Sequence, residues 1–166
     1  NPNRPVEKVS WADAQIFLTR LNAQQFANIP SGWAYVLPTE SQWEYACRAG
    51  TDTAYSWGDS ITASNANYSS SGLSQTRDVG YYADNPRGFF DMHGNVWEWT
   101  ADWYQAAYPS GNPVIDPTGP ASGSNRVRRG GSWQSNGANL RSAKRNGSPP
   151  GDRHNVGFRV GFQKSQ

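Results

Sequence analysis

Residues 129–159 read RGGSWQSNGANLRSAKRNGSPPGDRHNVGFR. Small polar residues, Gly and Pro dominate this stretch, but Trp133, Leu140 and Phe158 interrupt them at intervals. A segment rich in Ser, Asn, Gly and Pro is typical of a disordered linker. The interspersed apolar side chains and arginines instead predict a loop system that is anchored to a core and turns its polar positions toward solvent or a ligand. The alternative is an ordinary long surface loop.

The composition indicates a globular domain with an aromatic core. The chain has 166 residues, the size of one domain and enough to bury a core. Hydrophobic residues make up only 36%, but eight Trp, eight Tyr and six Phe supply large apolar side chains. The single cysteine, Cys47, excludes an internal disulfide and a multi-cysteine metal site.

Targeting features are missing from the sequence as given. No apolar run is long enough to cross a bilayer, and the first residues, NPNRPVEKV, do not resemble a signal peptide. We therefore expect a soluble chain. Because it starts without Met and reaches a structured pattern almost at once, we also expect a fragment of a longer protein, with any targeting signal outside it. The compartment and the oligomeric state are left open.

The charge of the chain is unevenly distributed. Residues 1–125 carry 6 Lys and Arg against 12 Asp and Glu, whereas residues 126–166 carry 9 against 1. A local basic segment is one feature of proteins that bind nucleic acid. Guanidinium groups spaced among packing residues can instead bind loop carbonyls and the acidic first part of the same chain. We favour this intramolecular role over nucleic-acid binding for Arg141, Arg145, Arg153 and Arg159.

Two helices are predicted from capping residues and apolar spacing. The first spans residues 10–25 and starts with a Ser-x-x-Asp capping box. The second spans residues 39–50, starts with a Thr-x-x-Gln box, and is expected to end at Gly50 in a left-handed conformation. Cys47 falls on the apolar face of the second helix, where the role of a small buried hydrophobe is favoured over that of a nucleophile.

The rest of the chain predicts few strands and long loops. Residues 96–99 alternate between the two faces of a strand. Residues 51–86 and 104–125 show neither the helical nor the strand periodicity of apolar residues. They are expected to form ordered loops. Further strands are expected at residues 33–37, 126–129 and 156–162, and aromatic packing from Trp43, Trp97, Trp99 and Trp133. The fold class is therefore α+β, with two helices, small antiparallel sheets and low regular secondary structure.

Seven motifs occur in order along nearly the whole chain: VSWADA, LPTESQWEYACRAGT, YSWGD, GFFDMHGNVWEWTADWY, RGGSW, LRSAKR and GFRV. Together they resemble the domain of the formylglycine-generating enzyme, or sulfatase-modifying factor, family. The resemblance implies a single domain over residues 1–166 with a C-type lectin-like fold and long ordered loops. The family's Gly-rich N-terminal strand pattern has no counterpart here, so the N-terminal edge is expected to be truncated or supplied differently.

The resemblance does not carry over the family's enzyme activity. That activity, a copper-dependent oxidation of a substrate cysteine, uses two cysteines after the Gly-Gly-Ser-aromatic turn, because thiolates hold Cu(I). In this sequence the two places fall at Ser135 and about Leu140. We therefore predict a protein without copper that is not this enzyme. The alternative is a sulfatase-modifying-factor-like enzyme or accessory domain that lacks the copper cysteines.

A narrower resemblance concerns residues 130–159. They look like the C-terminal variable region of proteins diversified by diversity-generating retroelements, in which adenines of a template, chiefly in Asn codons, are randomised. The resemblance implies a non-enzymatic protein that binds varied proteins or other macromolecules through this segment. Ser, Asn, Gly and Asp are also ordinary turn residues. The predicted variable, ligand-contacting positions are Gln134, Ser135, Asn136, Gly137, Asn139, Lys144, Asn146, Gly147, Ser148, Asp152 and His154, of which Gln134 and Lys144 need a different codon explanation.

The family resemblance also implies structural calcium. The residues that match the first site are Asp91, Gly94, Val96 and Glu98. Their spacing is chemically consistent, because carboxylates and inward-turned backbone carbonyls supply the oxygen ligands that Ca²⁺ prefers. The alternative is a turn with an exposed acid at each end. A second site is matched by Asn67 and the Tyr68 carbonyl, but its aspartate position falls on Ser71.

The two histidines lack a catalytic context. His93 is expected in a turn and His154 on the surface, and neither belongs to a recognisable hydrolytic triad. Asp102 is expected to pair with an arginine of the final segment rather than to act as a general acid. A deep pocket lined by Asp102, Asp152 and His154 would instead indicate an enzyme.

Overall fold

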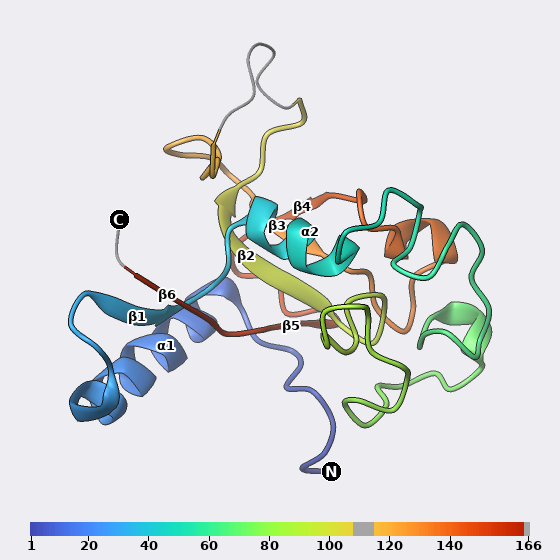
Figure 1. Ribbon diagram of the computed structural model, residues 1–166, viewed down its shortest axis with the longest axis horizontal. Helices are drawn as coiled ribbons and strands as arrows, with labels where there is room; N and C mark the ends of the chain where they lie inside the picture. The colour runs from blue at the N-terminus through green and yellow to red at the C-terminus, as the bar shows by residue number, and fades with distance from the viewer. Residues whose placement is uncertain (108–114, 165–166) are drawn as a thin grey trace.

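The computed structural model describes residues 1–107 and 115–164 (Figure 1). Part of the loop expected at residues 104–125 lies outside the described residues. The helices are α1 (Trp11–Gln25) and α2 (Glu40–Arg48), with short 3-10 turns η1 (Phe26–Asn28), η2 (Ser69–Ser71) and η3 (Gly137–Leu140). The strands are β1 (Trp33–Val36), β2 (Trp97–Trp103), β3 (Arg126–Arg129), β4 (Asn146–Ser148), β5 (Val156–Phe158) and β6 (Gly161–Lys164).

Both helices begin where their capping residues predict. The Ser10 hydroxyl accepts a hydrogen bond from the Asp13 N–H, and the Asp13 carboxylate accepts one from the Ser10 N–H at 2.8 Å. Thr39 begins α2 with the same reciprocal arrangement. The end of α2 differs in one detail from the prediction. Ala49, with φ 51°, takes the left-handed C-cap position ahead of Gly50.

Two small sheets carry the fold. β1 and β6 form an antiparallel pair beside α1, at one end of the molecule (Figure 1). The other sheet has the order β4-β3-β2-β5, in which β2 is antiparallel to β3 but parallel to β5. The prediction of antiparallel sheets is therefore wrong for the pairing of β2 with β5. The strand expected at residues 156–162 is also split into β5 and β6, which belong to different sheets.

Tryptophans from β2 and α2 build the core. Trp97 and Trp99 pack against the buried face of α1. Trp43 and Cys47 of α2 form a second cluster, and burial raises the pKa of the Cys47 thiol to about 12. The hydrophobic role expected of this cysteine is thereby confirmed. Trp133 is only half-buried, so three of the four expected tryptophans are core residues.

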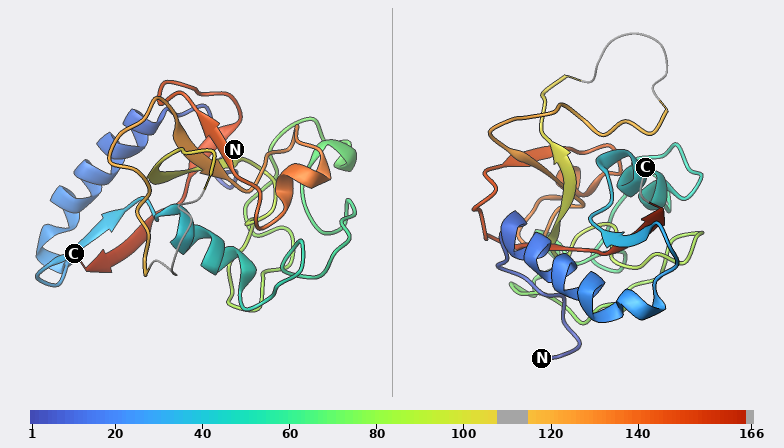
Figure 2. Two further views of the ribbon diagram at one scale, coloured as in Figure 1. Left: turned by 90° about the horizontal axis from the view of Figure 1, so that it is seen from above. Right: turned by 90° about the vertical axis from the view of Figure 1, so that its left-hand side faces the viewer.

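The part of the molecule away from α1 consists mainly of loops (Figure 2). A third cluster, formed by Tyr55, Tyr68 and Leu140, joins the loops after α2 to the C-terminal segment. The Tyr55 hydroxyl also donates to the Gly137 carbonyl oxygen at 2.8 Å. These contacts fix the position of residues 130–159 on the domain.

Candidate functional site

Residues 130–159 are held to the core at defined points. Leu140 is completely buried, and the His93 ring donates from Nδ1 to the Leu140 carbonyl oxygen at 2.6 Å. Gly131 has a left-handed φ of 76°, and a Cβ atom there would lie 2.6 Å from the Leu140 side chain. The segment is therefore the anchored loop system that the sequence predicts.

Three arginines of the segment bind the acidic first part of the chain, as predicted, whereas Arg141 binds a loop carbonyl, that of Ala138. Arg145 donates to both carboxylate oxygens of Glu40, at 2.5 and 2.7 Å. Arg159 donates to both oxygens of Glu98, at 2.5 and 2.6 Å, and Arg153 pairs with a carboxylate of α1 at 2.8 Å. Much of the basic charge of the segment is thus neutralised inside the protein, which weakens the argument for nucleic-acid binding.

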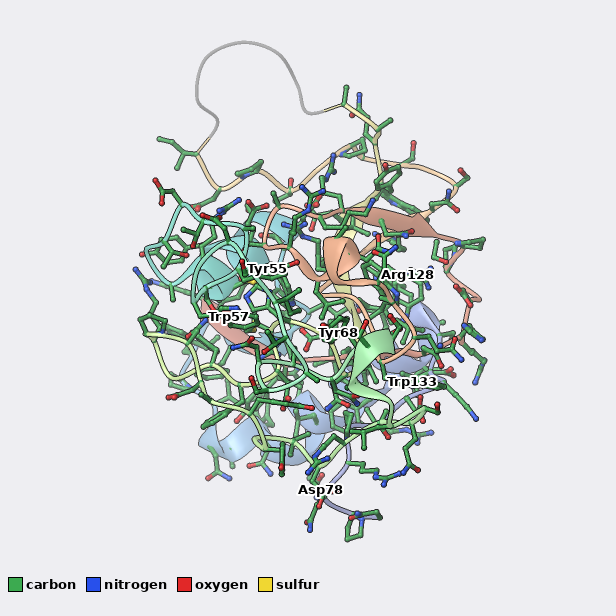
Figure 3. The ribbon with its side chains drawn as sticks, turned by 90° about the vertical axis from the view of Figure 1, so that its right-hand side faces the viewer. Tyr55, Trp57, Tyr68, Asp78, Arg128 and Trp133 are labelled. Carbon is green, nitrogen blue, oxygen red and sulfur yellow. The ribbon has the colours of Figure 1, made fainter. Side chains whose placement is uncertain are left out.

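The polar residues between these anchors surround an open pocket of about 430 Å³, named here the polar pocket. The pocket draws on residues of η2, η3, β3 and β4, and Figure 3 views the molecule from the side on which η2 and η3 lie. Six of the predicted ligand-contacting positions line it together: Gln134, Ser135, Asn136, Asn139, Asn146 and His154. Of these, His154 is exposed, as expected.

The other predicted positions lie outside this lining. They are Gly137, Lys144, Gly147, Ser148 and Asp152. Two of them bond inside the protein, since the Ser148 hydroxyl and the Arg128 guanidinium both donate to Asp152 Oδ2, at 2.5 and 2.9 Å. A Cβ atom at Gly147 would lie 2.5 Å from the Tyr104 ring, so a side chain there requires Tyr104 to move. Variation at these positions stays a prediction.

The polar pocket also includes five residues that the sequence does not predict: Ser69, Trp97, Arg128, Ser132 and Asn155. Arg128 is the one permanent charge among the described residues of the lining. It stands opposite Asn146, because β3 and β4 pair antiparallel. The alternation of β3 could have placed Arg128 and Arg129 on different faces, and Arg129 is indeed completely buried.

A second open pocket, of about 390 Å³, brings together the four residues of the first predicted calcium site and is named here the acidic pocket. Asp91 accepts from the Gly80 N–H at 2.8 Å, and burial raises the pKa of its carboxyl. Glu98 is held by Arg159 and by the Trp43 indole N–H, which donates to Oε2 at 2.6 Å. The two carboxylates are therefore positioned on one cavity.

The acidic pocket offers the oxygen atoms that a hard cation prefers, but Arg159 also lines it and binds both oxygens of Glu98. In residues 1–107 and 115–164, no three His, Cys, Asp or Glu side chains come together in a metal-binding group. Calcium would therefore depend on Asp91 and Glu98 together with the backbone carbonyls of Gly94 and Val96. Calcium at this site stays a prediction.

At the second predicted calcium site, the Asn67 side-chain oxygen already accepts a hydrogen bond from another residue of the protein. Asn67 is buried, and its amide oxygen accepts from the Ser71 hydroxyl at 2.8 Å. Its NH₂ group donates to the Gln75 carbonyl oxygen at 2.9 Å. Asn67 and Tyr68 as calcium ligands also stay a prediction.

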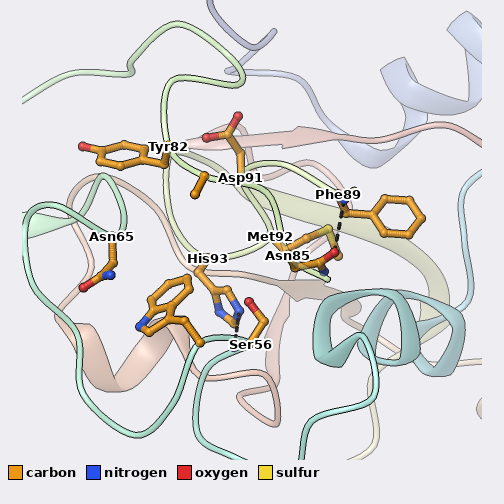
Figure 4. A pocket seen from close by; sticks show the side chains of 10 residues that line it. Ser56, Asn65, Tyr82, Asn85, Phe89, Asp91, Met92 and His93 are labelled. Carbon is orange, nitrogen blue, oxygen red and sulfur yellow. Dashed lines mark hydrogen bonds between the residues drawn. The ribbon is translucent and has the colours of Figure 1, made fainter. Parts of the chain in front are cut away.

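Two titratable side chains have environments that the sequence did not indicate. His93, expected in a turn, is buried beside a cavity of about 10 Å³ (Figure 4). Its Nε2 accepts from the Ser56 N–H at 3.2 Å, and burial lowers its pKa to about 4. Asp102 caps α2 by accepting from the Glu40 N–H at 2.6 Å. Burial raises the Asp102 pKa to about 6, against the effect of the nearby Arg145 charge.

Comparison with known proteins identifies the family. Residues 1–163 match the domain described as sulfatase-modifying factor enzyme 1-like. The chain is 34% identical over 177 residues to the formylglycine-generating enzyme of Streptomyces coelicolor, covering 95% of this chain and 52% of that protein. The chain belongs to this sulfatase-modifying factor family. It spans about half the length of the formylglycine-generating enzymes that it matches.

A bacterial kinase and a solved structure are also similar to this chain. The chain is 44% identical over 118 residues to the serine/threonine-protein kinase pkn1 of Chlamydia caviae, covering 69% of this chain and 19% of the kinase. The solved structure of Treponema denticola variable protein 1 superposes with a TM-score of 0.86 at 28% identity, covering 98% of this chain and 72% of that one. The predicted family fold, of the C-type lectin-like kind, is thereby confirmed.

In the described part, no helix could span a membrane.

The copper positions of the sulfatase-modifying factor family do not fit copper in this chain. At the first, the Ser135 hydroxyl accepts from the Ser132 N–H at 3.0 Å. At the second, Leu140 presents a buried hydrocarbon side chain. Neither supplies the soft thiolate that Cu(I) requires. The sole cysteine, Cys47, is buried in α2 against Met92.

Proposed function

We propose that this protein is a non-enzymatic binding module whose polar pocket contacts a macromolecular ligand, and that a retroelement diversifies the pocket residues. The observation that carries the proposal is the convergence of six predicted variable positions on one cavity. They come from separate parts of the segment, namely the loop before η3, η3 itself, β4 and the loop before β5. The similarity to Treponema denticola variable protein 1 supports the same proposal.

The contacts that hold the segment are separate from the side chains that line the pocket. Leu140 is buried in the cluster with Tyr55 and Tyr68, and Arg145 is bonded to Glu40. Asn139, the neighbour of Leu140, lines the pocket instead. Side chains on the pocket can therefore change without removing the Leu140 and Arg145 contacts. Ser135 is the exception among them, because it is buried and accepts from the Ser132 N–H.

The chemistry of the pocket favours binding over turnover. Its described lining contains no cysteine, and the Ser132 and Ser135 hydroxyls lie 3.3 Å from each other. A catalytic serine needs a base within hydrogen-bonding reach. The His154 ring instead lies against the Asn155 amide, at 3.2 Å. Neither Asp102 nor Asp152 joins His154 in the lining.

The binding part of the proposal is tested with two display libraries. One library varies the six pocket positions together, and the control varies six exposed positions on and after α1: Ala12, Thr19, Arg20, Ala23, Gln24 and Ala27. Members of the pocket library should stay folded and yield different binders against different target proteins. Equal yields from both libraries would show that the polar pocket is not the binding surface.

The diversification part is tested in the flanking DNA. We expect a reverse transcriptase gene nearby and a near-copy of the codons for residues 130–159 that differs at adenines. Complete flanking DNA with neither feature would remove diversification and leave a lectin-like binding domain.

A second candidate function is that of an accessory domain in a larger protein. The observation that favours it is the match to a part of the chlamydial kinase pkn1, of which this chain covers 19%. The complete reading frame tests it. A kinase or other catalytic domain in the same polypeptide would support it, and a reading frame with no further domain would exclude it.

A further inference from the structure

We propose that the polar pocket contains a carboxylate subsite, in which Arg128 and neighbouring amide NH₂ groups bind an Asp or Glu side chain of a protein ligand. The inference rests on the proposed function, because it names the ligand chemistry of the same pocket. Arg128 lies in β3, before the segment predicted to vary. Arg128 would thus be the constant part of the subsite, whereas the amide donors Gln134 and Asn136 belong to the predicted variable positions.

The Arg128 guanidinium is only partly used by the protein. Its Nη1 donates to Asp152 Oδ2 at 2.9 Å, and its Cζ lies 5.1 Å from the centre of the Trp97 ring. Among the described residues, no protein acceptor bonds its Nη2. The side chain is 16% exposed, so it is largely removed from water. A guanidinium in this state gains from an anionic acceptor that meets its unused side.

Two amides that line the same pocket as Arg128 present donors to a ligand. The Gln134 side-chain oxygen accepts from the Asn155 amide at 2.6 Å. The Asn136 side-chain oxygen accepts from Asn139, through the backbone N–H at 3.3 Å and the side-chain amide at 3.2 Å. With both oxygens bonded inside the protein, the NH₂ groups of Gln134 and Asn136 are left for a ligand. A carboxylate, which only accepts hydrogen bonds, matches this set of donors.

Asp152 pairs with Arg128 and so reduces the attraction of the Arg128 charge for a ligand in the pocket. Burial would raise the Asp152 pKa, but hydrogen bonds from the Ser148 hydroxyl and the His154 N–H, together with the Arg128 charge, lower it. Asp152 is therefore an anion that neutralises Arg128 from outside the lining. Because Asp152 is itself a predicted variable position, its exchange for a neutral residue would expose the full charge of Arg128 to the ligand.

The test uses a phage-displayed library of random linear peptides as the probe, selected on the unmodified protein. Selected peptides should share an Asp or Glu, and changing that residue to Asn or Gln should weaken binding about tenfold or more. On Arg128→Met the same peptide change should alter binding less than about twofold. On Asp152→Asn the acidic peptides should bind more tightly than on the unmodified protein.

Arg141→Met is the matched control, because Arg141 is exposed and its Nε bonds the Ala138 carbonyl oxygen at 3.1 Å. It should keep the preference for acidic peptides. Arg128→Lys retains the charge but not the fork, so it should keep part of the preference even if Arg128→Met unfolds. An equal acidic preference with and without Arg128 would overturn the subsite. Peptides that depend on Gln134 and Asn136 without any acidic preference would overturn it too, but would leave the proposed function standing.

Discussion

The polar and acidic pockets lie beside the same short stretch, residues 94–98, yet they present groups of opposite charge. The polar pocket contains Arg128 and amide donors, whereas the acidic pocket contains Asp91 and Glu98, with Arg159 bonded to Glu98. Trp97 lines the first and Glu98 the second. Successive side chains of a strand point to opposite faces. One strand therefore separates a pocket whose permanent charge is an arginine from a pocket in which two carboxylates outnumber one arginine.

The neighbouring arginines of β3 show what this difference means for stability. Arg129 is completely buried, donates to Glu44 and to the Lys144 carbonyl oxygen, and lies 3.5 Å from Glu40. Arg128 has one carboxylate partner and lines the polar pocket. The buried Arg129 has two carboxylates beside it, whereas Arg128 has one and faces the polar pocket. Substitutions should therefore affect folding on one side and binding on the other.

Replacing Arg129 by Leu should have the largest effect on folding. Glu44 and the buried Glu40 would lose a cation, and removing one partner of a buried ion pair lowers the free energy of unfolding by about 3–5 kcal/mol. Arg128→Leu should lower it by less, about 2 kcal/mol, because one charged hydrogen bond is lost and Asp152 would keep its others. Urea denaturation measures both values. Equal losses would contradict the contrast between the two arginines.

Leu140→Ala should be the next most destabilising change. The side chain has no exposed surface, and truncating a buried Leu costs about 3 kcal/mol of unfolding free energy. The neighbouring change Asn139→Ala should cost less than about 1 kcal/mol, because Asn139 lines the polar pocket. Thermal unfolding of the two variants separates the anchor from the pocket wall. A large loss for Asn139→Ala would place it among the anchors.

Acid should weaken the anchor of the segment through His93. Folding lowers the His93 pKa from 6.5 to about 4, because the ring is buried. The neutral ring therefore stabilises the fold above pH 6.5, and this contribution, about 3 kcal/mol, is lost progressively as the pH falls from 6.5 through 4. His93→Gln keeps a donor and an acceptor but does not titrate. Urea midpoints for both proteins across this pH range should show a smaller decline for the variant.

The features predicted correctly from the sequence are those with local causes. The starts of α1 and α2 follow from capping residues within one helical turn. Arg126–Arg129 was predicted as a strand and is β3. The parallel pairing of β2 with β5 was not predicted, because it depends on which distant segments meet in the folded chain.

The same limit applies to the candidate sites. The polar positions of residues 130–159 could be chosen by composition and by the family resemblance, and six of them do share a pocket. Arg128 could not be assigned to that pocket, because its place there depends on the pairing of β3 with β4. The prediction of a turn position for His93 misses its burial. The bend at Gly94 lies in the core instead. There the His93 ring accepts a hydrogen bond from the Ser56 N–H and donates one to the Leu140 carbonyl oxygen.

Calcium should have the smallest effect and should act on the acidic pocket alone. At about ten times its Kd, an ion bound only by the folded state would add about 1.4 kcal/mol, or a few degrees in Tm. Chelator should lower Tm by this amount in the unmodified protein, and added calcium should restore it. Asp91→Asn removes one of the two carboxylates, so its Tm should not respond to either reagent. Asp152→Asn, beside the polar pocket, should respond fully. An unmodified protein that keeps the same Tm with chelator, once shown to be free of retained metal, would leave the acidic pocket as a purely structural ion pair between Glu98 and Arg159.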